Sequence, residues 1–218
     1  MFAIPTGATT APAAPIAPVE MLSMQGVAAA QPPLGEPVHE RMRIRSATLN
    51  VLAGQTMRAK GTLLPRLADA KVSLQLLLGR RWVSVASTRT GARGRFALRY
   101  APPRIGSWVA QLRYRGVGGA PGATRRLGVL SSFQAAEASW YGGGGGMACG
   151  GQLTSATMGV ANKTLPCGTW LTIRYGDRSV RVQVVDRGPY VAGREFDLTE
   201  ATKQALGFEG VGVVWATR

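Results

Sequence analysis

Two aspartates near the C-terminal end of the chain, Asp186 and Asp197, could carry proton-transfer chemistry. Asp186 follows a run in which valines alternate with polar residues over 180–184, a pattern that predicts a half-buried strand. Gly188 and Pro189 predict a turn directly after it. Asp186 is therefore expected at the end of a strand, at the lip of a groove, where a carboxyl group could act as a general acid.

Asp197 has a second interpretation, because a short helix is predicted directly after it. Asp197 and Glu200 have the spacing of a helix N-cap and its N3 partner, and Gly207 stands where a C-terminal glycine is expected. The residues predicted to share the apolar face are Leu198, Ala201, Ala205 and Leu206. Capping and chemistry are equally supported for Asp197.

Asp186 also has a purely structural alternative. Arg187 is its neighbour and could hold the carboxylate ionised in a turn-capping pair. To protonate a leaving oxygen near neutral pH, the pKa of Asp186 would have to be raised by burial or by a nearby carboxylate such as Asp197.

Three sequence runs in the C-terminal part resemble a known family. They are ASWYG at 138–142, NKTLPCGT at 162–169 and DRGPYVAGREFDLT at 186–199. Together they resemble the double-psi β-barrel domain of the rare lipoprotein A (RlpA) family of peptidoglycan lytic transglycosylases and, more distantly, the barrel of expansins. The resemblance covers about residues 137–218.

The resemblance implies roles for particular residues. Asp186 falls on the essential aspartate of the family, and Asp197 matches a second functional acid of related barrels. Such enzymes need one acid/base, because the C6 hydroxyl of the muramic acid replaces water and gives a 1,6-anhydro product. The candidate substrate-binding residues are Tyr141, Gln152, Asn162, Arg187 and Tyr190.

Two positions depart from the family pattern. Asn162 stands where a functional His is usual, and Gly151, or Gln152 after a one-residue gap, stands where a functional Glu is usual. None of these can relay a proton, although Asn and Gln can hydrogen-bond a sugar. The departures leave glycan binding intact and count against turnover, and restoring His at 162 is expected to raise cleavage.

Cys149 and Cys167, the two cysteines of the chain, both lie in this C-terminal part. In an exported protein they would form a disulfide, and the alternative is a pair of buried free thiols. The single histidine, His39, lies far from them in the sequence, so no zinc site, other metal site or cofactor is expected.

The net charge of +15 is concentrated in residues 41–133, which hold 18 basic residues and one acidic residue. The same segment contains seven short alternating runs, which predict an immunoglobulin-like (Ig-like) β-sandwich. Anionic wall polymers are the expected partners of this surface. Nucleic acid is less well supported, because no reading helix or RNA-binding motif is present. The charge could also serve solubility alone.

The remaining features complete the predicted organisation. Residues 1–40 are rich in Ala and Pro and predict a disordered tether without a visible signal peptide or membrane span. The five glycines of 142–146 predict either a flexible loop or a close approach of a saccharide to the backbone.

The expected fold is all-β, with a tether (1–40), an Ig-like sandwich (41–133) and a six-stranded double-psi β-barrel (134–218). The expected protein is extracellular or associated with the cell wall. It would bind peptidoglycan glycan strands and either cleave them or act as a non-catalytic, expansin-like wall-loosening module.

Overall fold

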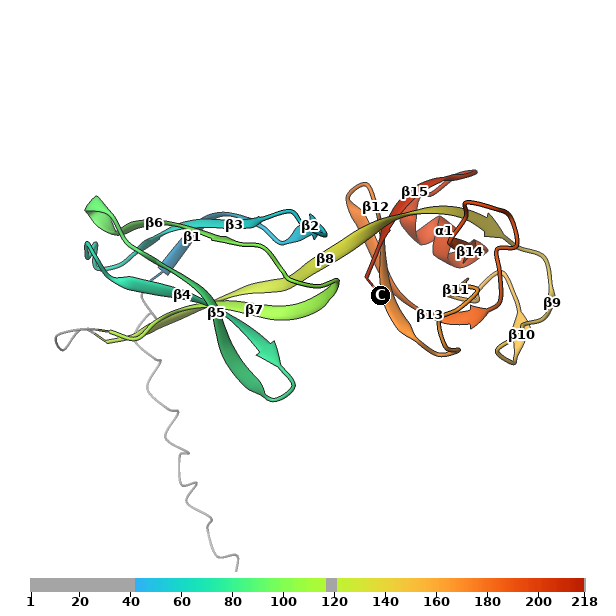
Figure 1. Ribbon diagram of the computed structural model, residues 1–218, viewed down its shortest axis with the longest axis horizontal. Helices are drawn as coiled ribbons and strands as arrows, with labels where there is room; N and C mark the ends of the chain where they lie inside the picture. Colours follow the sequence, from blue (N-terminus) through green and yellow to red (C-terminus); the bar gives the residue numbers. More distant parts are fainter. Residues whose placement is uncertain (1–41, 117–120, 218) are drawn as a thin grey trace, which may run out of the picture. The chain divides into compact units, whose positions relative to one another are not determined.

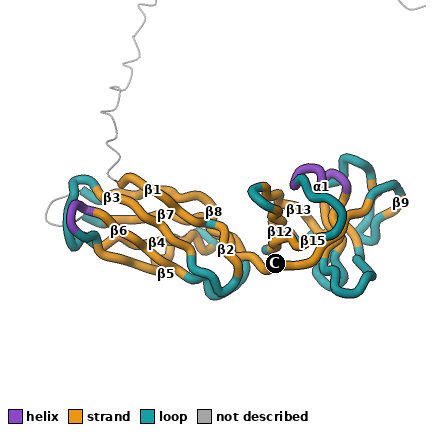
Figure 2. The backbone as a smooth tube through the Cα atoms, turned by 90° about the horizontal axis from the view of Figure 1, so that it is seen from above, coloured by secondary structure: helices purple, strands orange, loops and turns teal. Residues whose placement is uncertain are grey.

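The computed structural model describes residues 42–116 and 121–217 (Figure 1). The predicted tether at 1–40 lies outside the described residues. The described chain is built mostly of β-strands, and a single α-helix occurs within it, as Figure 2 shows in orange and purple.

The N-terminal part contains two sheets. The first has the order β1 (Met42–Thr48), β3 (Met57–Leu63) and β6 (Arg95–Tyr100), and the short 3₁₀ turn η1 (Ala92–Gly94) leads into β6. The second has the order β2 (Asn50–Leu52), β8 (Ala123–Tyr141), β7 (Gly106–Tyr114), β4 (Lys71–Leu78) and β5 (Arg81–Arg89). The seven predicted runs are all strands, and the first of them divides into β1 and β2.

The two sheets share one hydrophobic core. Alternate residues of β3 and β4, such as Met57 and Leu74, are fully buried in it. Phe96, Leu98 and Leu112 are also buried in this core. Two tryptophans are only partly buried: the guanidinium of Arg126 lies 5.4 Å from the ring centre of Trp82, and that of Arg104 lies 6.0 Å from the ring centre of Trp108. Cation–π contacts of this kind keep one ring face near the surface.

The C-terminal part is a sheet that closes on itself. Its further strands are β11 (Gly159–Ala161), β12 (Trp170–Tyr175), β13 (Arg178–Asp186), β14 (Phe196–Thr199) and β15 (Gly212–Ala216). Pairing runs from β8 through β14, β11, β13, β12 and β15 back to β8. Val182, Val184, Phe196 and Leu198 point into the enclosed core. The short strands β9 (Gly145–Gly146) and β10 (Gln152–Leu153) pair in the loop between β8 and β11.

Strand β8 takes part in both sheet systems. The sequence predicted separate strands at 124–132 and 138–142, whereas the structure has one strand of 19 residues. Its first half pairs with β7 and its second half with β14 and β15. The intervening residues continue the ladder because β15 supplies backbone partners for them.

The single helix, α1 (Glu200–Leu206), begins later than predicted. Its N-cap is Thr199, so the expected cap role of Asp197 is wrong: Asp197 lies in strand β14, where β8 and β11 flank it. Gly207 ends the helix in the left-handed conformation, as predicted. The apolar face also differs from the prediction, since the buried helical residues are Thr202 and Leu206 while Ala205 is exposed.

Candidate active site

Asp186 is the last residue of β13, as the sequence predicted, and a β-bulge determines which way it faces. Val160 of β11 lies opposite Val184, but Ala161 lies opposite Asp186, so Val185 is an extra residue in the ladder. Without this extra residue, Asp186 would lie on the same face of the strand as Val182 and Val184, and its side chain would point into the core. The bulge instead places Asp186 opposite Ala161, on the other face of the sheet.

Asp197 and Tyr141 share this face. Ala161 lies opposite Asp197 of β14, and Asp197 lies opposite Ser139 of β8, two residues before Tyr141. Residues that face each other across paired strands point to the same side of a sheet. Asp186 and Asp197 therefore flank Ala161, with about 9–10 Å between their backbones, two strand spacings.

The environment of Asp197 favours the protonated carboxyl. Burial raises its pKa, while a hydrogen bond from Ser139 Oγ to Asp197 Oδ1 (2.8 Å) and the positive charge of Arg194 partly offset this effect. The pKa of Asp197 is thus shifted toward that of a proton donor.

Tyr141 is held in its neutral form beside both aspartates. Burial raises the pKa of its hydroxyl above the usual range, and the negative charges of Asp186 and Asp197 add to this effect. The hydroxyl is buried, and it forms no hydrogen bond of acceptable geometry with the described residues, although Asp186 is close enough to influence its pKa. A neutral phenol in this position is available as a hydrogen-bond donor.

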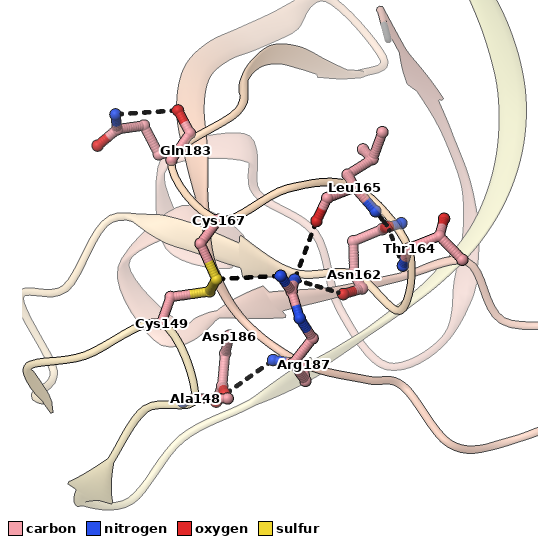
Figure 3. Close-up of a disulfide and its surroundings, with 10 residues drawn as sticks. Ala148, Cys149, Asn162, Thr164, Leu165, Cys167, Gln183, Asp186 and Arg187 are labelled. Atoms are coloured by element: carbon pink, nitrogen blue, oxygen red, sulfur yellow. Dashed lines mark hydrogen bonds between the residues drawn. A yellow bond between two sulfur atoms is a disulfide. The ribbon is translucent and has the colours of Figure 1, made fainter.

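Two backbone groups fix one oxygen of Asp186. The N–H groups of Ala148 and Arg187 each donate to Asp186 Oδ1 at 2.8 Å. The side chain of Arg187 turns away from the carboxylate, and its Nη1 donates to the carbonyl oxygens of Asn162 (3.1 Å) and Leu165 (3.0 Å), as Figure 3 shows. The predicted Asp186–Arg187 ion pair is therefore not formed in the described chain.

Asn162 organises the loop beside the site. Its Oδ1 accepts hydrogen bonds from the N–H groups of Thr164 (3.0 Å) and Leu165 (2.8 Å), and its Nδ2 donates to the carbonyl oxygen of Glu195 (3.0 Å). Asn162 is 2% exposed, so these hydrogen bonds are buried.

Cys149 and Cys167 form the predicted disulfide, with 5.5 Å between their Cα atoms. The bond joins the segment that contains Ala148 to the loop that Asn162 and Arg187 hold (Figure 3). Arg187 Nη2 also donates to Cys167 Sγ at 3.0 Å. The disulfide thereby fixes the segment that donates to Asp186 to the loop that Arg187 contacts.

Comparison with known proteins finds similarity in the part of the chain that contains this site. Residues 133–216 match the family model described as lytic transglycolase. The probable endolytic peptidoglycan transglycosylase RlpA of Aquifex aeolicus is 43% identical over 82 residues, which are 35% of this chain and 36% of that protein. The protein of the same name from Nostoc is 40% identical over 93 residues (39% and 24%). RlpA of Neisseria meningitidis is 36% identical over 89 residues (38% and 37%).

Over these residues the C-terminal part is similar to RlpA proteins and to the lytic transglycolase family model, and it is called the RlpA-like barrel below. The chain spans about a quarter to two fifths of the length of these relatives. Among solved structures, the Streptomyces papain inhibitor matches 39% of this chain and 94% of its own, at 22% identity and a TM-score of 0.32.

The other predicted site residues of the RlpA-like barrel lie in its loops. Tyr190 is 83% exposed and follows the site in the Gly188–Pro189 segment. Gln152 is exposed in β10. Gly151 has a φ of +82°, which disfavours Glu at this position.

Sequence reasoning missed several groups that shape the RlpA-like site. Ser139, three residues before the glycine run, contacts Asp197, and Ala148 contributes only its backbone N–H. The buried hydroxyls of Thr199 and Thr202 both bond to the backbone of Gly159. Small hydroxyl residues and backbone donors have no distinctive sequence signal, because their roles depend on strand register.

The described ranges contain no group of three or more His, Cys, Asp and Glu side chains that could hold a metal ion. They also contain no helix of the length and apolar character needed to cross a membrane.

Proposed function

We propose that the RlpA-like barrel binds a peptidoglycan glycan strand along the Tyr141, Asp197 and Asp186 face and cleaves it as a lytic transglycosylase. The bulge at Val185 is the observation that carries this proposal, because it turns Asp186 out of the core and onto the face of the second carboxyl. The matched relatives are named as peptidoglycan transglycosylases, which supports the same substrate class.

In the proposed reaction, Asp186 is the acid and then the base. Backbone N–H groups occupy Oδ1, so Oδ2 would exchange the proton. The carboxyl protonates the leaving glycosidic oxygen as the C1–O bond breaks. The C6 hydroxyl of the muramic acid forms the new bond to C1 and returns its proton to Asp186, giving the 1,6-anhydro product. Tyr141 would donate a hydrogen bond to the bound sugar, and the carboxyl of Asp197, whose pKa is raised by burial, would hydrogen-bond a sugar hydroxyl on the same face.

A second candidate function is glycan binding without cleavage. The hydrogen bonds that Asn162 makes to the loop, together with the positive φ of Gly151, favour it, because they assign structural tasks to the two positions where the family usually has His and Glu. Retained binding and absent cleavage would then define a wall-binding or expansin-like module.

The proposal extends to the whole chain. We assign residues 1–40 to a tether, 41–133 to an Ig-like sandwich and 134–218 to a six-stranded barrel, a division that the separate core clusters and the closed strand pairing support. The disulfide supports a location outside the cytoplasm. The excess of basic residues in 41–133 supports binding of anionic wall polymers.

Digestion of peptidoglycan sacculi, followed by mass spectrometry of the products, tests the cleavage. Wild type should release 1,6-anhydro muropeptides, and Asp186→Asn should release none while it still sediments with sacculi, because an amide keeps the shape but has no proton to deliver. The charge-matched control is Asp177→Asn, whose fully exposed carboxylate lies in the β12–β13 turn and should not matter. If wild type releases no anhydro products, the cleavage proposal is contradicted and glycan binding without cleavage remains.

A further inference from the structure

The N-terminal part contains a polar cavity that the barrel chemistry does not explain. It has a volume of about 560 Å³ and lies on β4, β5 and β7. This volume is within the range of pockets that bind small ligands. Three cationic side chains line it: Lys71, Arg113 and Arg115.

No carboxylate of this part neutralises these cations. Asp69 is the only acidic residue among the described residues of 42–133, and it is bound to Arg89 at 2.9 Å. Lys71, Arg113 and Arg115 are all exposed at the cavity. Three unneutralised cations around one cavity favour an anionic occupant.

The floor of the cavity, formed by Gln75 and Ser84, belongs to a row of hydrogen-bonded polar side chains that continues to Gln111. Gln111 Nε2 donates to Gln75 Oε1 (2.9 Å), and Gln75 Nε2 donates to Ser84 Oγ (3.2 Å). Gln75 is 4% exposed and Gln111 is 7% exposed, which is unusual for polar residues on the outer side of a sheet. In the next row, Ser73 lies opposite both Ser87 and Arg113, so hydroxyl groups stand beside the cations.

Tyr114 borders the cavity, but its side chain does not face it. Tyr114 lies opposite Val72, and both are buried in the hydrophobic core between the two sheets, whereas Ser73 and Arg113 face the cavity.

We propose that this cavity binds a polyol phosphate unit of an anionic wall polymer. The cations would bind the phosphodiester, while the serine hydroxyls and the amide of the floor would bind the polyol hydroxyls. Nucleic acid fits less well, because single strands are held by aromatic faces on which bases stack. Tyr114 is the aromatic residue of the lining, and its ring is buried.

This inference rests on the proposed binding of wall polymers by residues 41–133, and it is independent of glycan cleavage. The test measures the affinity of the full chain for a synthetic ten-unit oligo(glycerol phosphate) by calorimetry at low salt. A ten-residue polyglutamate and a ten-nucleotide single-stranded DNA carry comparable charge and serve as comparison ligands.

The variants separate the cavity from general charge. Arg113→Gln should weaken binding of the glycerol phosphate oligomer about tenfold, since one charge-assisted hydrogen bond is lost. Ser73→Ala should weaken it about three- to tenfold, as expected for a single hydrogen bond from the Ser73 hydroxyl of the lining. Arg99→Gln makes the same charge change at an exposed position of β6 and should alter affinity less than about twofold.

Three results would overturn the proposal. Equal losses from Arg99→Gln and Arg113→Gln would show binding to overall charge, and the polymer-binding part of the proposed function would survive. Equal or tighter binding of DNA or polyglutamate would identify a different ligand class. If the oligomer shows no saturable binding, both the proposed role of the cavity and the polymer partner are contradicted. Release of anhydro products would still test the barrel separately.

Discussion

At the scale of single residues, the site separates two carboxyl groups by environment. Asp186 is fixed at Oδ1 by two backbone N–H groups, whereas Asp197 accepts one hydrogen bond from Ser139 and has a pKa raised by burial. Both carboxyl groups raise the pKa of the Tyr141 hydroxyl, which is therefore a neutral hydrogen-bond donor. Different environments allow neighbouring carboxyl groups to take different roles in one site.

Asp197→Asn should change how stability depends on pH. Because the folded-state pKa of Asp197 is raised, ionising it costs the folded state, and stability is lost as pH rises above the ordinary value of 3.8. Asn cannot ionise, and its Oδ1 can still accept the bond from Ser139. Urea unfolding should find the variant more stable than wild type at pH 7 and equal to it near pH 3. A variant that is less stable at both values would contradict this account.

Asn162→His should destabilise the barrel, which revises the expectation that it would raise cleavage. Asn162 Oδ1 satisfies two backbone N–H groups, and a neutral imidazole offers one acceptor. Each backbone N–H left unpaired costs about 1–3 kcal/mol. Thermal unfolding should show the loss, and Asn50→His, at an exposed position of β2, should not. Increased release of anhydro products from Asn162→His would restore the original expectation.

At the scale of elements, the bulge in β13 depends on a close approach from β11. Val185 packs against Gly159, where a Cβ atom would meet Val185 Cγ1 at 2.8 Å and Val185 Cβ at 3.1 Å. The buried hydroxyls of Thr199 and Thr202 hold the N–H of Gly159 at 3.1 and 2.9 Å. The backbone N–H of Gly159 is therefore hydrogen-bonded, and Val185 occupies the space that a side chain at this position would need.

Gly159→Ala should displace Val185 and, with it, the direction of Asp186. Overpacking of this kind costs typically about 1–3 kcal/mol, and a shift of about 1 Å in a catalytic group can reduce the rate about 100-fold. Unfolding experiments and the sacculus assay would measure the two effects. Gly91→Ala is the matched control, because the nearest atom to its added Cβ is 3.9 Å away. Unchanged cleavage in Gly159→Ala would show that the bulge does not aim the acid.

At the scale of the whole molecule, charge and chemistry occupy different parts of the chain. Residues 41–133 hold 18 basic residues and one acidic residue, whereas 134–218 hold eight basic and seven acidic residues. The cavity with three cations lies in the first part and the two site aspartates in the second. The part of the chain that would attract anionic polymers is therefore distinct from the part that would bind and cleave glycan strands.

Binding of the full chain to purified walls that carry anionic polymers should therefore weaken steeply between about 50 and 200 mM salt, where the Debye length falls. Binding to sacculi stripped of these polymers should depend less on salt, because the barrel is nearly neutral. Co-sedimentation at a series of salt concentrations measures both. Equal salt dependence on the two kinds of wall would show that the positive charge has no polymer partner.

The sequence by itself determined features that depend on neighbouring residues. Alternation of valines located β13 and placed Asp186 at its end, and Gly207 marked the end of α1. The three motifs of the barrel predicted its resemblance to RlpA proteins, and the number and context of Cys149 and Cys167 predicted their disulfide. These signals survive in sequence because backbone alternation, turns and cysteine counts are local or compositional properties.

Only the tertiary structure decided which groups meet at the site. The extra residue Val185 sets the face of Asp186, and pairing of β14 with both β8 and β11 turned Asp197 from a predicted helix cap into a strand residue beside Ser139. Both outcomes depend on register between segments far apart in the sequence. A shift of one residue reverses the face of every side chain in a strand, and no local pattern in the sequence encodes that shift.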